Sequence, residues 1–160
     1  MRKYILGMAL FMMTALTVVS CSSDKLQGVK IDQDQFSVVM PTGWEQDVTG
    51  EGKFQYLNLK KTKSGTVAKL SFHSYANRTD TPASLMRAMC REKNGWEYQA
   101  DQELGDNTWS IAYAPNNNKK YAPRHNAFTA LKNGVLCVQL ENIDINDAEV
   151  KAILESIEVK

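Results

Sequence analysis

The feature that most constrains the fold is Asn133-Gly134, which separates two runs rich in β-forming residues, 125–132 and 135–141. Asn-Gly between two such runs favours a two-residue type I′ turn, because both central positions of that turn need a positive φ. The sequence therefore predicts an antiparallel hairpin across residues 125–141.

The turn also predicts the pairing of the two strands, with Leu131 opposite Leu136. One face of the hairpin would then carry Thr129, Leu131, Leu136, Val138 and Leu140. The other would carry Phe128, Ala130, Cys137 and Gln139, and it is also too apolar for open water. We therefore expect cover on both faces, with a helix on at least one.

Further periodic segments predict the rest of the domain. Alternating or β-rich runs predict strands at residues 36–40, 54–61, 66–75, 96–103 and 108–114. A helix is expected to open at Thr81-Pro82, with Thr81 as N-cap. A second is expected over residues 146–157, where Val150, Ile153, Leu154 and Ile157 share one face and Asn146 and Glu149 resemble a capping box. The fold class predicted is α+β, an antiparallel sheet of about six strands with helices packed on it.

The N-terminus has the pattern of an export signal. Arg2 and Lys3 precede an uncharged, mostly apolar run over residues 5–19, which is shorter than the roughly 20 residues of a membrane span. The run ends in Val18-Val19-Ser20-Cys21, which resembles the bacterial lipobox, and this resemblance implies acylation of Cys21. An ordinary secretory signal and an uncleaved anchor are the alternatives.

This pattern divides the chain into three parts. Residues 1–20 are predicted to be a lipoprotein signal peptide, residues 21–33 the lipidated Cys21 with a flexible tether, and residues 34–160 a single α+β domain. We expect the protein in the bacterial cell envelope, anchored in the outer membrane on its periplasmic or surface face. Its first predicted partner is thus the membrane itself, through acylated Cys21.

Two further cysteines remain, Cys90 and Cys137. An even pair in an exported protein permits one disulfide, and two buried free thiols are the alternative. Their spacing matches no zinc signature, and no metal site is predicted.

The segment from Phe36 to Trp44, Phe-Ser-Val-Val-Met-Pro-Thr-Gly-Trp, resembles the strand-Pro-x-x-Trp opening of PsbP-like proteins. These include photosystem accessory proteins, a yeast Ran-binding protein and bacterial lipoproteins of the DcrB type. The helix after Thr81-Pro82 and the closing residues 153–157 occupy matching places. The resemblance implies an α/β/α sandwich and a protein that binds or assembles rather than catalyses.

The residues alone show no catalytic motif. There are two histidines, His73 and His125, and each is expected to be a solvated surface side chain. The sequence has no Gly-x-Ser-x-Gly elbow, no Ser-x-x-Lys at a helix start and no phosphate-binding Gly-rich loop. We therefore expect neither an enzyme nor a cofactor; an envelope hydrolase using His73 or His125 is a further alternative.

A candidate recognition loop follows the strand at 108–114. It consists of Asn116, Asn117, Asn118, Lys119, Lys120 and Tyr121. Amide groups, cations and aromatic rings commonly contact a binding partner. A solvated hairpin loop is the alternative reading. A formal net charge of +1 without a basic cluster argues against nucleic acid as partner.

Together these features predict a lipid-anchored, non-enzymatic accessory or binding protein whose partner is an envelope protein or another envelope component. The alternative is a small-molecule or lipid carrier, with Trp44, Trp96 and Trp109 lining an apolar pocket.

Overall fold

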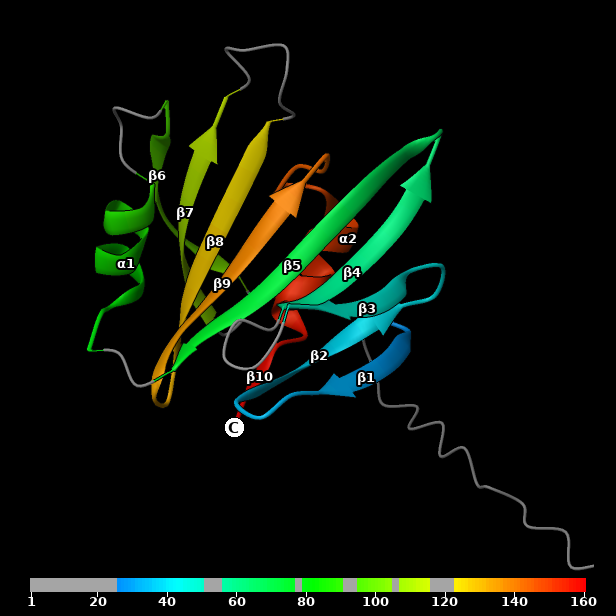
Figure 1. Cartoon of the computed structure of the whole chain (residues 1–160), viewed down its shortest axis with the longest axis horizontal. Coiled ribbons are helices and arrows are strands. Elements are labelled where there is room, and N and C mark those ends of the chain that lie inside the picture. The colour runs from blue at the N-terminus through cyan, green and yellow to red at the C-terminus, as the bar shows by residue number, and fades with distance from the viewer. Residues whose placement is uncertain (1–25, 51–55, 77–78, 91–94, 105–106, 116–122) are drawn as a thin grey trace, which may run out of the picture.

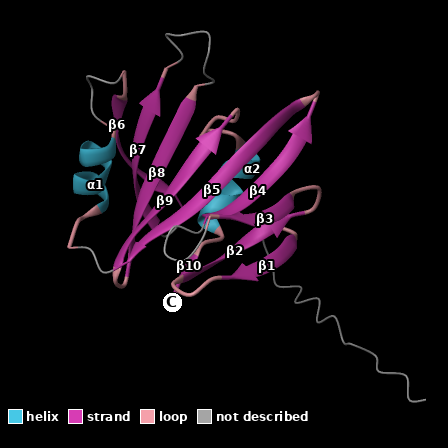
Figure 2. Cartoon of the chain, viewed as in Figure 1, coloured by secondary structure: helices cyan, strands magenta, loops and turns pink. Residues whose placement is uncertain are grey.

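The computed structural model describes residues 26–50, 56–76, 79–90, 95–104, 107–115 and 123–160. These residues form ten strands and two helices (Figure 2). In chain order the elements are β1 (Gly28–Asp32), β2 (Phe36–Pro41), β3 (Glu45–Thr49), β4 (Tyr56–Lys63), β5 (Thr66–Ala76), α1 (Pro82–Met89), β6 (Glu97–Leu104), β7 (Asn107–Ala114), β8 (Arg124–Leu131), β9 (Gly134–Glu141), α2 (Ala148–Glu155) and β10 (Glu158–Val159). Neither helix is long and apolar enough to cross a membrane, as far as the described residues extend.

The strands form two antiparallel sheets (Figure 1). The larger has seven strands in the order β3-β4-β5-β9-β8-β7-β6, and its centre is the long β5 paired with β9. The smaller has three strands in the order β1-β2-β10, so the last strand of the chain pairs with the second.

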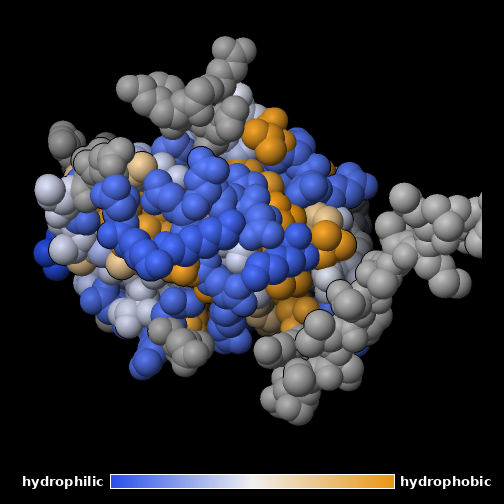
Figure 3. All heavy atoms as spheres, turned by 90° about the horizontal axis from the view of Figure 1, so that it is seen from below, coloured by the Kyte–Doolittle hydropathy of each residue, from blue (hydrophilic) through white to orange (hydrophobic). Residues whose placement is uncertain are grey.

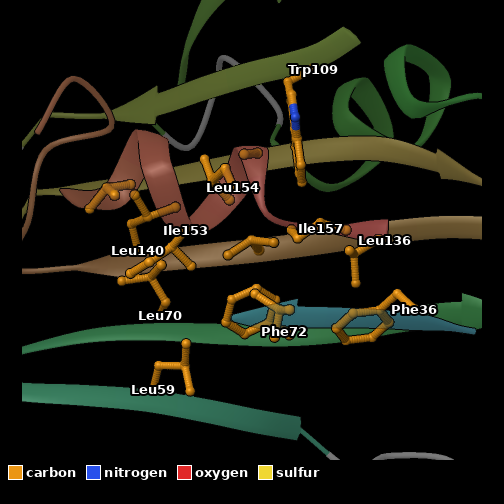
Figure 4. Close-up of a cluster of buried hydrophobic side chains, with 14 of the residues drawn as sticks. Phe36, Leu59, Leu70, Phe72, Trp109, Leu136, Leu140, Ile153, Leu154 and Ile157 are labelled. Atoms are coloured by element: carbon orange, nitrogen blue, oxygen red, sulfur yellow. The ribbon is translucent and has the colours of Figure 1, made fainter. Parts of the chain in front are cut away.

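The main hydrophobic core lies between one face of the large sheet and a second layer made by α2 and the small sheet. Figure 4 shows side chains of the sheet, among them Leu70, Phe72 and Leu140, meeting Ile153 and Leu154 of α2. From the small sheet, Phe36 stacks on Phe72 with ring centroids 6.0 Å apart. The apolar spacing that predicted the C-terminal helix thus faces this core, as expected.

Among the described residues, α1 covers part of the opposite face of the large sheet. The contact is a smaller apolar cluster of Leu85, Met86, Cys90, Ala112, Phe128, Val135 and Cys137. The predicted N-cap is confirmed, because the hydroxyl of Thr81 accepts a hydrogen bond from the backbone N–H of Ser84 and Pro82 opens the helix. Both faces of the β8–β9 hairpin are therefore covered, as its composition indicated.

The predicted α/β/α sandwich of PsbP-like type is wrong. Each helix has only eight residues, and a three-stranded sheet supplies much of the second layer. The additional strands, beyond the six or so expected, include β1, β3 and β10. β1 and β3 are edge strands with one or no buried side chain, so they lack the apolar alternation that marks a strand in sequence. β1 also lies within residues 21–33, the predicted tether.

The hairpin is confirmed, but its predicted pairing is wrong. Leu131 lies opposite Gly134 and Thr129 opposite Leu136, so the two turn residues are Lys132 and Asn133. The difference is a shift of two residues, which leaves every side chain on its predicted face because the side-chain period of a strand is two. Asn133 does not have the positive φ that a type I′ turn requires.

Candidate functional site

A hollow of about 280 Å³ lies at the end of the large sheet where β7 ends and β8 begins. It is lined by Tyr113, Pro123, His125, Asn142, Ile143 and Asp144. The lining comes from three separate pieces of chain: the end of β7, the start of β8, and the connection from β9 to α2. Antiparallel pairing of β7 with β8 and of β8 with β9 brings these pieces together.

His125 is the central side chain of this hollow. It lies on the α2 side of the sheet, opposite Leu140 on β9 and opposite Tyr113 on β7. Its ring stacks on that of Tyr113 with centroids 4.5 Å apart, and the residue is only 6% exposed. The expectation of a solvated histidine was therefore wrong at this position.

Burial lowers the pKa of His125 below its ordinary value, and the charge of Asp144 opposes that effect. A neutral imidazole offers one N–H donor and one nitrogen acceptor. At neutral pH the hollow thus presents a neutral ring that can hydrogen-bond, beside an exposed carboxylate.

Local hydrogen bonds hold the wall formed by the β9–α2 connection. Asn142 takes a left-handed conformation with φ of 57°, which asparagine tolerates, and its amide donates to the carbonyl oxygen of Val67 at 3.0 Å. Asp144 Oδ1 accepts from the backbone N–H of Asn146 at 2.7 Å. Asp144 thus helps to shape the polar segment that leads into α2.

The candidate recognition loop, Asn116 to Tyr121, lies outside the described residues. Its flanks are described: Ala114 pairs with Arg124, and Pro123 lines the hollow. His125 and the described residues on either side of that segment therefore lie at one end of the sheet.

His73 lies on the opposite face of the sheet and does not meet His125. It is 7% exposed and lies between Tyr56, with ring centroids 4.5 Å apart, and Tyr75, with centroids 4.3 Å apart. Its solvated surface position, expected from the alternation of β5, is therefore also wrong. Flanking aromatic rings bury a face that was predicted to be open.

Beside His73, a row of polar side chains crosses the part of this face that α1 does not contact. Asn58 donates to Asp47 at 2.9 Å and accepts from Ser71 at 2.6 Å. A neighbouring row of charges is also paired, since Lys69 lies 3.0 Å from Glu141 and Lys60 contacts Asp47. These groups largely satisfy one another, which is typical of a structural polar face on an antiparallel sheet.

The three tryptophans do not share a pocket. Trp44 and Trp109 are buried in the main core, whereas Trp96 packs against the smaller cluster on the other face. A second hollow, of about 370 Å³, is lined by Gly43, Glu45, Lys60, Lys61, Thr62 and Val67 and contains no tryptophan. The carrier alternative therefore gains no support from these side chains.

Cys90 and Cys137 both lie in the smaller cluster as buried free thiols. Burial raises the pKa of Cys90 to about 11 and raises the pKa of Cys137 further. The disulfide stays a prediction. Within the described part of the chain, no group of His, Cys, Asp and Glu side chains could hold a metal ion.

The partners of His125 could not be identified from the sequence. No sequence signal links His125 with Tyr113 or Asp144, because both come from other segments of the chain. Neither a protein-family model nor a curated protein matches the chain.

Proposed function

We propose that this chain is a lipid-anchored, non-enzymatic binding protein of the bacterial cell envelope. Acylated Cys21 holds it to the membrane, and the end of the sheet that carries the hollow and residues 116–121 binds an envelope protein or component. One observation carries the proposal: the hollow is lined by Tyr113 and Pro123, which lie on either side of the candidate recognition loop in the chain.

The position of β1 supports an orientation in which the hollow lies far from the membrane anchor. Gly28 follows Cys21 by seven residues, and a fully extended chain of that length reaches about 25 Å at most. β1 therefore stays close to an anchored Cys21. In Figure 1, β1 lies at the lower side of the view, and the ends of β7 and β8 at the hollow lie at the top. In this proposal the binding end faces away from the membrane.

The surface near β1, on the side of the anchor, combines polar and hydrophobic residues. Figure 3, seen from below, shows a mainly hydrophilic surface with hydrophobic residues exposed between the polar ones. On β1, Val29 is 62% exposed, but the neighbouring Lys30 is paired with Glu158 at 2.6 Å. The charges of Lys30 and Glu158 therefore largely cancel each other at this end.

The lining of the hollow supports binding over hydrolysis. A serine, threonine or cysteine hydrolase needs that hydroxyl or thiol within reach of a base. The described side chains around His125 are Tyr113, Asn142, Ile143 and Asp144 with Pro123, and none of them is a serine, threonine or cysteine. Stacked on Tyr113, the imidazole serves as part of a contact surface.

Photocrosslinking in intact cells tests the proposal. A photoreactive amino acid at position 142, beside the hollow, is expected to capture a defined envelope partner. The same amino acid at position 29, which is exposed on β1, should not capture it. Equal capture from both positions, or none from 142, contradicts the proposed surface.

A charge-reversal pair tests the loop. Lys119→Glu with Lys120→Glu should weaken capture from position 142 at least several-fold while leaving the unfolding midpoint unchanged. Lys63→Glu with Lys132→Glu is the matched control, because both lysines are exposed and the change in net charge is the same. If both pairs weaken capture equally, the effect comes from the net charge of the protein and not from the loop, which contradicts the loop's role in binding.

A further inference from the structure

Cys90 ends α1 and reaches toward the sheet. It is the C-cap residue, with its N–H donating to the carbonyl oxygen of Met86 at 2.7 Å, and it is 9% exposed. Its Sγ lies 3.7 Å from Nδ2 of Asn126 on β8. The sulfur is thus aimed at the sheet surface beneath the helix.

Cys137 lies on that same surface. It pairs with Phe128, and Asn126 precedes Phe128 by two residues on β8, so Cys137 and Asn126 are diagonal neighbours on one face. Side chains in that relation start less than about 8 Å apart. Since the Cys90 sulfur touches Asn126, it lies near Cys137 too, and the electrostatic influence of Cys90 on Cys137 agrees with this.

We infer that Cys90 and Cys137 form a disulfide that joins the end of α1 to β9 in the exported protein. The two thiols lose two protons and two electrons to a disulfide oxidant, a thiol–disulfide oxidoreductase or a small disulfide. One S–S bond forms in the chain, and the S–S bond of the oxidant breaks to give two thiols. Only the source of the oxidant rests on the proposed function, because an envelope location supplies an oxidising compartment.

The bond forms before α1 settles on the sheet. The thiolate attacks in disulfide exchange, and with a pKa of about 11 only on the order of 1 in 1,000 Cys90 thiols is ionised at pH 8. Both sulfurs are also shielded by the cluster around Phe128. A chain that folds fully reduced therefore oxidises slowly, whereas an unfolded chain has two ordinary, accessible thiols.

Peptide mapping tests the inference on the full-length protein. Membranes are dissolved in denaturant with an alkylating agent that traps free thiols, and the chain is cut with trypsin without reduction. Cys90 is released in residues 88–91 and Cys137 in residues 133–151. We expect these two peptides joined by a bond that reductant breaks, and we expect Cys90→Ala and Cys137→Ala each to leave the other cysteine alkylated.

The acylation state of Cys21 in the same sample separates this inference from the proposed function. If Cys21 is acylated and both peptides are alkylated, or are joined to another thiol, the disulfide inference is overturned and the anchor stands. If Cys21 is not acylated, the proposed function fails, and refolding of the purified, reduced chain with oxidised glutathione decides the inference. A linked pair after refolding supports it, and two unlinked peptides overturn it.

Discussion

Replacing Gly134 by alanine tests the pairing at the centre of the large sheet. Gly134 has a φ of 130° and lies opposite Ala76 on β5. A Cβ at this position would lie 2.1 Å from the carbonyl oxygen of Tyr75. The contacted atoms are backbone, so relief requires a displacement of β5 or β9 rather than a side-chain rotation.

The expected loss of unfolding free energy has two parts. A left-handed φ costs a residue with a Cβ about 1–2 kcal/mol. An overpacked contact that backbone must accommodate adds about 1–3 kcal/mol. Gly134→Ala should therefore destabilise the fold by about 2–5 kcal/mol.

Gly65 provides the matched control. It lies in the β4–β5 turn with a φ of 79°, and a Cβ there would have no atom within 4 Å. Gly65→Ala should cost about 1–2 kcal/mol from the backbone alone. Urea unfolding followed by tryptophan fluorescence measures both. If Gly134→Ala costs no more than Gly65→Ala, the close approach of β9 to β5 is not as described.

Two further predictions concern the hollow and the helix beside it. Burial lowers the pKa of His125, so the unfolded chain binds a proton more readily than the folded one. The free energy of unfolding should therefore fall as the pH drops below about 6.5. His125→Phe should reduce this loss in urea titrations between pH 5 and pH 8. A pH dependence unchanged by His125→Phe would contradict a buried, neutral His125. Asp147→Ala should cost about 1 kcal/mol, because the carboxylate caps α2 by accepting from the N–H groups of Glu149 and Val150, whereas Asn146→Ala should cost clearly less. If Asn146→Ala lowers the melting temperature more than Asp147→Ala does, the N-cap is Asn146, as the sequence predicted, and not Asp147.

The central strands were predictable because their alternation is strong. Alternate residues reach the main core at the centres of these strands, namely Leu70 and Phe72 of β5 and Leu136, Val138 and Leu140 of β9. The predicted faces of the β8–β9 hairpin are correct although its pairing was misplaced by two residues. Face depends on the odd or even position of a residue, whereas pairing depends on the turn. Here the close approach of β5 requires a glycine at position 134. Taking Asn133-Gly134 as the two turn residues therefore gave the wrong turn, which consists of Lys132 and Asn133.

The edge strands and the hollow were not predictable on the same grounds. β1 buries only Ile31, so nothing in its sequence distinguishes it from a tether. His125 was visible as a candidate, but its neighbours Tyr113 and Asp144 come from other segments. Their meeting depends on the pairing of β7 with β8 and on the path from β9 to α2, which are long-range properties of the sheet.

Acyl labelling of Cys21 tests the central claim most directly. Cells that produce the full-length chain are grown with a clickable fatty acid, and the chain is isolated and scored for label and for membrane association. The anchored binding protein proposed here predicts label and membrane association in the wild type, and loss of the label in Cys21→Ser with release or failure of processing. A Cys21→Ser chain that still carries the label and fractionates with membranes would contradict it.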